Sequence, residues 1–119
     1  MDLNAQKIRP YSTPVSGAEL RTGRTYFSVT YADEHMRIPV IETLVFLGRN
    51  LSEGDTNRLY FQDADSYIRG VRFETARETD GAEFHTCTPK DLGAVFELEN
   101  AIEELLRCVT RGRDQDRAT

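Results

Sequence analysis

The segment from residue 38 to residue 48, IPVIETLVFLG, constrains the fold more than any other part of the chain. Side chains alternate between the two faces of a strand, and here both faces are apolar. One set consists of Val40, Leu44 and Phe46, and the other of Ile41, Val45 and Leu47. A strand that is apolar on both faces is typical of the centre of a sheet. We therefore expect this strand to be central and covered on both sides.

Shorter stretches of strand-forming residues flank this segment. Residues 24–32 alternate aromatic and β-branched side chains, which predicts a strand that precedes it. Residues 58–62 and 66–75 predict two further strands after a polar loop over residues 49–57. The turn-forming residues 63–65 lie between those two strands, so we expect the two strands to form a hairpin.

A further strand is predicted over residues 82–88. It follows Asp80-Gly81, a pair typical of two-residue hairpin loops. A strict two-residue loop would place Glu78 opposite Glu83, and like charges that face each other across strands are unfavourable. A longer loop therefore competes with it, and the register around Asp80-Gly81 stays open.

The last element is an amphipathic helix. Its apolar stripe consists of Val95, Leu98, Ile102, Leu105, Leu106 and Val109. The polar side chains opposite the stripe are Glu97, Asn100, Glu103, Glu104 and Arg107. This pattern predicts that the stripe packs on the core and that the acidic side chains face solvent. Residues 94–98 fit either the start of this helix or a last strand that precedes a helix from Glu99.

About five short strands followed by one helix, without strand–helix alternation, argue against a parallel α/β fold. The order predicts an α+β domain: a small antiparallel meander of about five strands, curled into an SH3-like barrel, with one C-terminal amphipathic helix. The chain resembles small SH3-like bacterial domains in element order alone. We place a single globular domain at residues 20–109, between an irregular N-terminal arm over residues 1–19 and a flexible polar tail over residues 110–119.

The distribution of charge limits the classes of partner. The formal net charge is −5, from 20 acidic and 15 basic side chains, and the excess of acid lies in residues 61–119. The basic side chains are scattered among acids, whereas a nucleic-acid binder gathers them on one face to neutralise phosphates. We therefore do not expect a nucleic acid as a partner. We expect no membrane contact either, because the sequence lacks a stretch of about 18 apolar residues.

The sequence also predicts the compartment. The first residues lack the basic and then apolar layout of a secretory signal. Cys87 and Cys108 form no CxxC pair, so we expect both thiols to stay reduced in a cytoplasmic protein. The 13 arginines against 2 lysines are a bias that we associate with GC-rich bacterial genomes.

Three residues are candidates for catalysis. His85 and Cys87 stand two apart on a predicted strand and point to one face, and a histidine can activate a cysteine thiolate. His35 follows two acidic residues in a predicted turn, where solvated charge is the commoner reason for such a run. The cysteines and histidines lack metal-ligand spacing, and no phosphate-binding glycine loop occurs, so the sequence predicts no metal and no cofactor.

A binding surface is predicted from aromatic and apolar side chains on the strands. Aromatic side chains give large contact areas with few rotamers to restrict. The candidates are Tyr26, Tyr60, Tyr67, Val40, Leu44 and Phe46. Residues 38–48 offer more apolar surface than one helix stripe covers, so we expect the domain to bind a protein partner or a second copy of itself.

Together these features predict a non-catalytic bacterial cytoplasmic domain that acts through protein binding or self-association. The alternative is a small enzyme or ligand-binding barrel that uses His85 and Cys87 in a pocket between the sheet and the helix. The sequence names neither a substrate nor a small-molecule ligand.

Overall fold

The structure is a computed structural model that describes residues 10–118, and the side chains of residues 10–112. Within these residues the strands are β1 (Thr25–Tyr31), β2 (Pro39–Arg49), β3 (Leu59–Asp63), β4 (Phe84–Cys87) and β5 (Val95–Phe96). The α-helices are α1 (Ala64–Ile68) and α2 (Leu98–Ala118), and the short 3-10 helices are η1 (Gly17–Glu19), η2 (Glu78–Asp80) and η3 (Pro89–Asp91). The expected α+β class is confirmed.

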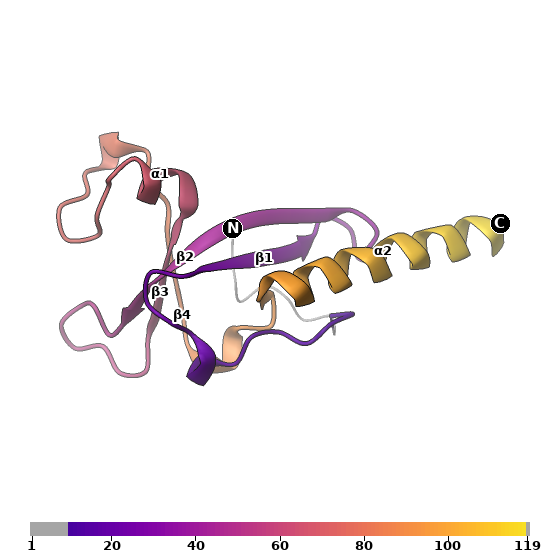
Figure 1. The fold of residues 1–119 in the computed structure, drawn as a ribbon, viewed down its shortest axis with the longest axis horizontal. Coiled ribbons are helices and arrows are strands. Elements are labelled where there is room, and N and C mark those ends of the chain that lie inside the picture. The colour runs from indigo at the N-terminus through magenta and orange to yellow at the C-terminus, as the bar shows by residue number, and fades with distance from the viewer. Residues whose placement is uncertain (1–9, 119) are drawn as a thin grey trace.

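β2 lies at the centre of the sheet, as its apolar pattern predicts. The strand order is β4-β3-β2-β1-β5, and every neighbouring pair is antiparallel. The first four strands form a meander, and β5 returns to pair with β1. β4 and β5 are the two edges, so the sheet is not closed into a barrel, and the expected SH3-like barrel is not confirmed (Figure 1).

A bulge near the end of β2 bends the sheet. Phe46 pairs with Phe61, but Gly48 pairs with Tyr60, so Leu47 is an extra residue in the ladder. Gly48 has a φ of 140°, which glycine adopts without strain. Bulges increase the local twist. In Figure 1, β3 and β4 accordingly run steeply across the direction of β1.

Each face of the sheet carries its own core. One face packs against the N-terminal segment and the residues that precede β5, and its buried members are Val15, Leu20, Tyr26, Leu44, Phe46, Leu59, Phe61, Cys87, Leu92 and Val95. The opposite face packs against α2, and its buried members are Val29, Phe96 and Ala101, with Phe27, Tyr31 and Leu105 partly buried beside them. The middle of β2 is therefore covered on both sides.

Residues 66–75 do not form the predicted strand. The carboxylate of Asp63 accepts a hydrogen bond from the N–H of Ser66 at 2.9 Å and so caps the start of α1. The predicted hairpin is therefore wrong, and β3 pairs with β4 instead. Asp80 ends η2, and Gly81 follows with a φ of 70°, so Asp80-Gly81 does not form the two-residue hairpin loop, which was one of the alternatives that the sequence left open.

The C-terminal helix starts and ends later than its pattern predicts. Residues Val95–Phe96 form β5 and α2 begins at Leu98, so the alternative with a short last strand is correct. α2 continues to Ala118, and its helical backbone therefore spans most of the predicted tail. Figure 1 shows this part of α2 projecting beyond the β1–β2 hairpin.

α2 packs on the sheet with a face that differs from the predicted one. The side chains buried against the sheet are Ala101, Glu104 and Cys108. The predicted core stripe is exposed at Leu98, Ile102, Leu106 and Val109. Leu105 is partly buried, and Val95 is buried as part of β5. The prediction is therefore wrong for Glu104, which is buried, and for the four exposed apolar side chains, whereas Glu99 is exposed as predicted.

Hydrogen bonds to Glu104 explain this orientation. Its carboxylate is fully buried and accepts a hydrogen bond from the Tyr31 hydroxyl at 2.5 Å and one from the Ser12 N–H at 2.7 Å. One turn later, the Cys108 thiol donates to the Met36 carbonyl at 3.3 Å. These bonds fix α2 to β1, to the turn after β1 and to the N-terminal segment. They also satisfy a carboxylate that would otherwise be costly to bury.

The N-terminal segment packs against the domain where the structure describes it. The Tyr11 hydroxyl donates to the Met36 carbonyl at 3.1 Å. The Tyr11 ring also meets the Tyr31 ring edge-on, with 6.0 Å between the centroids. Residues 10–19 contain η1 as their only helix or strand, and residues 1–9 of the predicted arm lie outside the described residues.

We expect Glu104→Ala to lower the free energy of unfolding by about 2–4 kcal/mol, because the Ser12 N–H and the Tyr31 hydroxyl lose their acceptor. Glu104→Gln keeps an acceptor oxygen and should cost less, about 1 kcal/mol. Urea unfolding at one fixed protein concentration measures both. Glu103→Ala is the matched control, because its side chain is partly exposed and pairs with exposed Arg107, and it should cost less than about 0.5 kcal/mol. Equal losses at the two positions would contradict this role of Glu104.

Candidate functional site

Cys87 is a core residue. Its side chain is 1% exposed and belongs to the cluster around Leu59 and Phe61. Burial, with a further contribution from the Asp91 carboxylate, raises the pKa of this thiol to about 11. The predicted pairing of Cys87 with His85 is therefore not supported, because the thiol stays protonated and His85 approaches two carboxylates instead.

His35 lies in the turn between β1 and β2, at the end of the sheet away from β4. Asp33 shapes this turn, because its carboxylate accepts hydrogen bonds from the N–H groups of Arg37 at 2.9 Å and Ile38 at 2.8 Å. Glu34 and His35 beside it are exposed. Within this run Asp33 therefore stabilises the turn, and Glu34 and His35 are exposed to solvent. His35 lies apart from His85.

Four of the six residues predicted to form a binding surface are core residues. They are Tyr26, Leu44, Phe46 and Tyr60, none more than 5% exposed. The N-terminal segment covers the first three, and Phe73 packs edge-on against Tyr60. Tyr67 is partly buried, with the Arg72 guanidinium 4.2 Å from its ring centroid. Only Val40 of the six is exposed, so these residues do not form a surface together.

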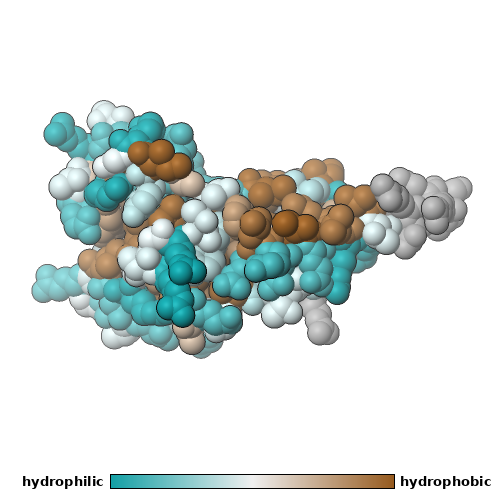
Figure 2. All heavy atoms as spheres, viewed as in Figure 1, coloured by the Kyte–Doolittle hydropathy of each residue, from teal (hydrophilic) through white to brown (hydrophobic). Residues whose placement is uncertain are grey.

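An apolar surface lies instead on α2 and the hairpin beside it. We define the apolar face by six exposed side chains: Ile38, Ile41, Leu98, Ile102, Leu106 and Val109. The four from α2 recur at the spacing of helical turns and form a stripe. Ile41 pairs with Val29 at the edge of α2, and Ile38 follows the turn that binds Cys108. Figure 2 shows hydrophobic residues gathered along α2 and over this hairpin.

The charges along the part of α2 beside the sheet change sign. An acidic pair, Glu99 and Glu103, comes first, and a basic pair, Arg107 and Arg111, follows one and two turns later. Arg107 also forms an ion pair with Glu103 within the chain. Beyond the basic pair the helix carries Asp114 and Asp116 among further arginines, so its end is mixed in charge.

A second cluster of polar side chains lies on the sheet face opposite α2. Glu42 of β2, Glu83 before β4 and His85 of β4 bring three possible ligand atoms within 4.8 Å of one another. The Nε2 atom of His85 is 3.5 Å from Oε1 of Glu42 and 3.8 Å from Oε2 of Glu83. The imidazole is 10% exposed, and Nε2 has no hydrogen-bond partner among the residues that the structure describes.

The curl of the sheet brings these residues together. His85 pairs with Phe61 and Phe61 with Phe46, whereas Glu42 stands four residues before Phe46. In a flat sheet the Cα atoms of Glu42 and His85 would be about 16 Å apart. Sequence spacing did not reveal the cluster because its members come from two strands that are not neighbours. The only local signal is that Glu83 and His85 stand two apart and thus share a face.

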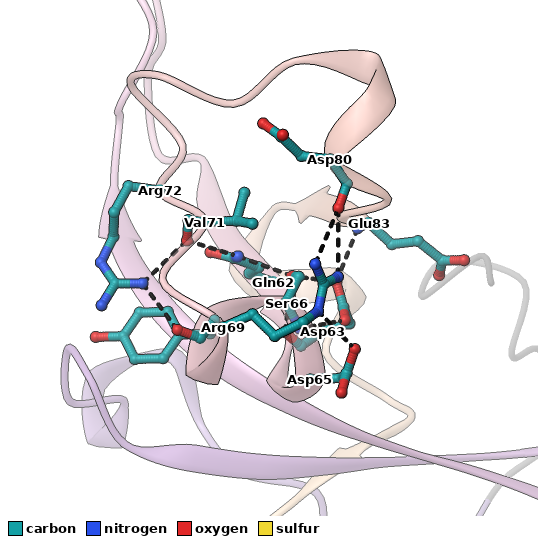
Figure 3. A network of polar contacts seen from close by, with 10 residues as sticks. Gln62, Asp63, Asp65, Ser66, Arg69, Val71, Arg72, Asp80 and Glu83 are labelled. Carbon is teal, nitrogen blue, oxygen red and sulfur yellow. Dashed lines mark hydrogen bonds and ion pairs between the residues drawn. The ribbon is translucent and has the colours of Figure 1, made fainter.

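A polar network anchors Glu83 (Figure 3). Oδ1 of Asp63 accepts a hydrogen bond from the Glu83 N–H at 2.8 Å, and the Asp63 N–H donates to the Glu83 carbonyl at 3.1 Å. The buried Ser66 hydroxyl donates to Oδ1 of Asp63 at 2.6 Å and accepts from the Gln62 amide at 2.9 Å. Burial alone would raise the pKa of Asp63, but these donors outweigh it and hold the pKa below its usual value.

Two hollows on the surface lie away from this cluster. Polar side chains that include Arg21, Arg24 and Glu97 line one hollow, near the start of α2. Leu47 and Phe73 help to line the other. His85 and Cys87 line neither hollow. The two hollows therefore do not support the alternative function, a pocket built on His85 and Cys87.

Comparison with known proteins finds no match: no family model, no curated protein and no solved structure matches this chain. Within residues 10–118, none of the helices has both the length and the apolar character that crossing a membrane requires. The apolar face and the polar cluster around His85 are the two features of the described residues that bear on function.

Asp63 should make stability depend on pH. Its folded-state pKa lies below the unfolded value of about 3.9, so the ionised carboxylate stabilises the fold above that pH. This contribution is lost as the pH falls from about 4 through the folded-state pKa. We expect Asp63→Asn to be less stable at pH 7 and to lose less further stability on acidification. Urea unfolding between about pH 3 and 7 measures the free energy of unfolding. Asp65→Asn is the control, because the Asp65 side chain is exposed. Equal slopes of this free energy against pH for Asp63→Asn and the unsubstituted chain would contradict the prediction.

Cys87 should react slowly while the protein is folded. Because its pKa is about 11 and its side chain is buried, little thiolate forms at pH 8 and reagents reach it poorly. We expect alkylation by iodoacetamide to be slower than in denaturant by about 100-fold or more. Peptide mass spectrometry over time distinguishes Cys87 from Cys108. Rapid labelling of Cys87 in the folded protein would instead indicate an activated nucleophile.

Proposed function

We propose that this chain acts by self-association, as an antiparallel dimer in which two copies pack their apolar faces together. The orientation of α2 supports this proposal. It places Glu104 and Cys108 against the sheet and leaves Ile102 and Leu106 exposed to water. Single exposed apolar residues are common on proteins, but a continuous apolar patch marks an interaction site. A second copy supplies a surface of matching chemistry.

The charges of α2 favour the antiparallel orientation. A parallel pair would bring the acidic pairs Glu99 and Glu103 of the two copies together, and likewise the basic pairs Arg107 and Arg111. An antiparallel pair places the acidic pair of one copy at the level of the basic pair of the other, and it opposes the two helix dipoles. A two-fold axis that crosses α2 between Ile102 and Leu106 creates this complementarity twice.

The apolar face is large enough to support association. Each of its six side chains is between 49% and 63% exposed. Burying half of such a side chain contributes on the order of 1 kcal/mol. Summed over both copies, this is about 12 kcal/mol, against a cost of association of about 4–15 kcal/mol. At the lower end of that cost about 8 kcal/mol remains, which corresponds to a dissociation constant in the micromolar range.

We further propose that the dimer is non-catalytic and acts in a bacterial cytoplasm. A non-catalytic role is supported by the buried, protonated thiol of Cys87. A bacterial cytoplasmic setting is part of the proposal, and the free thiols of Cys87 and Cys108 fit a reducing compartment. An SH3-like architecture also stays a proposal, supported by the return of β5 to β1 and by the curl of the sheet.

Sedimentation equilibrium at about 1–100 µM tests the dimer. We expect a dimer at the higher concentrations for the unsubstituted chain, and monomers for Ile102→Glu and Leu106→Glu. Ile68→Glu is the matched control, because Ile68 is 82% exposed on α1, outside the apolar face, and this variant should still dimerise. Circular dichroism checks that each variant is folded. A chain that is monomeric at about 100 µM would contradict self-association.

Disulfide cross-linking tests the orientation. Leu98 and Val109 lie at the two ends of the stripe, so an antiparallel pair places Leu98 of one copy near Val109 of the other. Under mild oxidation, a mixture of Leu98→Cys and Val109→Cys should give linked dimers, and Leu98→Cys alone should give few. Efficient cross-linking of Leu98→Cys alone would indicate a parallel pair.

A further inference from the structure

We infer that Glu42, Glu83 and His85 form a binding site for a divalent first-row transition-metal cation, with Zn²⁺ as the best fit. The inference depends on one buried atom. Nε2 of His85 lies between two carboxylates and has no hydrogen-bond partner among the described residues. Buried polar atoms without a partner are rare in folded proteins. A cation at this point would bind the imidazole nitrogen and both carboxylates.

The distances fit a tetrahedral zinc site. Zn²⁺ binds imidazole nitrogen and carboxylate oxygen at about 2.0–2.2 Å, so two ligand atoms of such a site stand about 3.4 Å apart. The distance from Nε2 of His85 to Oε1 of Glu42 is already 3.5 Å, and that to Oε2 of Glu83 is 3.8 Å. The Glu83 side chain is 64% exposed, so it can complete the site without disturbing the core.

The donor set also indicates the class of metal. Imidazole nitrogen suits Zn²⁺ and its neighbours in the first transition row, whereas Mg²⁺ and Ca²⁺ take six or more oxygen ligands. The carboxylates of Glu42 and Glu83 balance the two positive charges of the cation. Three protein ligands leave a fourth tetrahedral position for a water molecule, the arrangement found in catalytic zinc sites.

The fold holds the three ligands in place. Glu42 and His85 belong to β2 and β4, and the backbone of Glu83 is bound on both sides to Asp63. The cluster lies on the sheet face opposite α2, so it is independent of the apolar face and of the proposed dimer. The competing state is an imidazole of His85 that pairs with the two carboxylates and binds no metal.

Isothermal titration calorimetry with ZnCl₂ tests the site on the full chain under reducing conditions. We expect one Zn²⁺ per chain, with Glu42→Gln, Glu83→Gln and His85→Gln each weakening the affinity by about tenfold or more. Glu34→Gln and His35→Gln are the matched controls, because they change the same residue types at exposed positions. A Co²⁺ titration should show no thiolate-to-metal absorption, because buried Cys87 and Cys108 take no part.

Circular dichroism and sedimentation separate the possible outcomes. Glu83→Gln changes an exposed side chain, so it should leave the fold intact while it weakens Zn²⁺ binding. Zn²⁺ should leave the oligomeric state unchanged. Absence of Zn²⁺ binding, or affinity that survives both Glu42→Gln and Glu83→Gln, would overturn the inference and favour a metal-free pairing of His85 with the two carboxylates. Equal affinity for Zn²⁺ and Mg²⁺ would overturn the choice of metal.

Discussion

The buried carboxylate of Glu104 determines how α2 sits on the sheet. It accepts hydrogen bonds from the Tyr31 hydroxyl and from the backbone of Ser12, and thus joins the helix to β1 and to the N-terminal segment. A carboxylate can be buried only where donors satisfy it. Turning the helix to bury Ile102 and Leu106 would break both bonds. The exposed apolar stripe is therefore a direct consequence of one satisfied polar group.

The hydrophobic pattern of α2 does not describe the core of one chain, and in the proposed dimer it describes the interface. Amphipathic periodicity shows that a helix buries one face, but it does not show against which chain. In the middle of β2 the pattern does describe the core, because Leu44, Val45 and Phe46 are buried, whereas Ile41 nearer its start is exposed. The two elements differ because β2 has sheet neighbours on both edges and packed residues on both faces, whereas α2 packs on the sheet along one side only.

The sequence was sufficient to predict the strands whose patterns are local. It was misleading where one residue type is typical of two structures. Residues 24–32 alternate in the way that is typical of a strand, and residues 58–62 are rich in the apolar and aromatic residues that strands favour. Asp63, by contrast, is typical both of a turn and of a helix N-cap. The sequence does not decide between them, but the bonds of Asp63 to Ser66 and Glu83 do. The role of Glu104 was also hidden, because its partners lie more than 70 residues away.

The cluster around His85 follows from the geometry of the whole sheet. Glu42 and His85 lie on strands separated by β3, and no sequence spacing relates them. They meet because the bulge at Leu47 and Gly48 twists β3 and β4 across β1. A flat sheet would keep the imidazole and the carboxylate of Glu42 apart. The strong curl of the sheet is thus what lets these three side chains meet, and the inferred cation site depends on it.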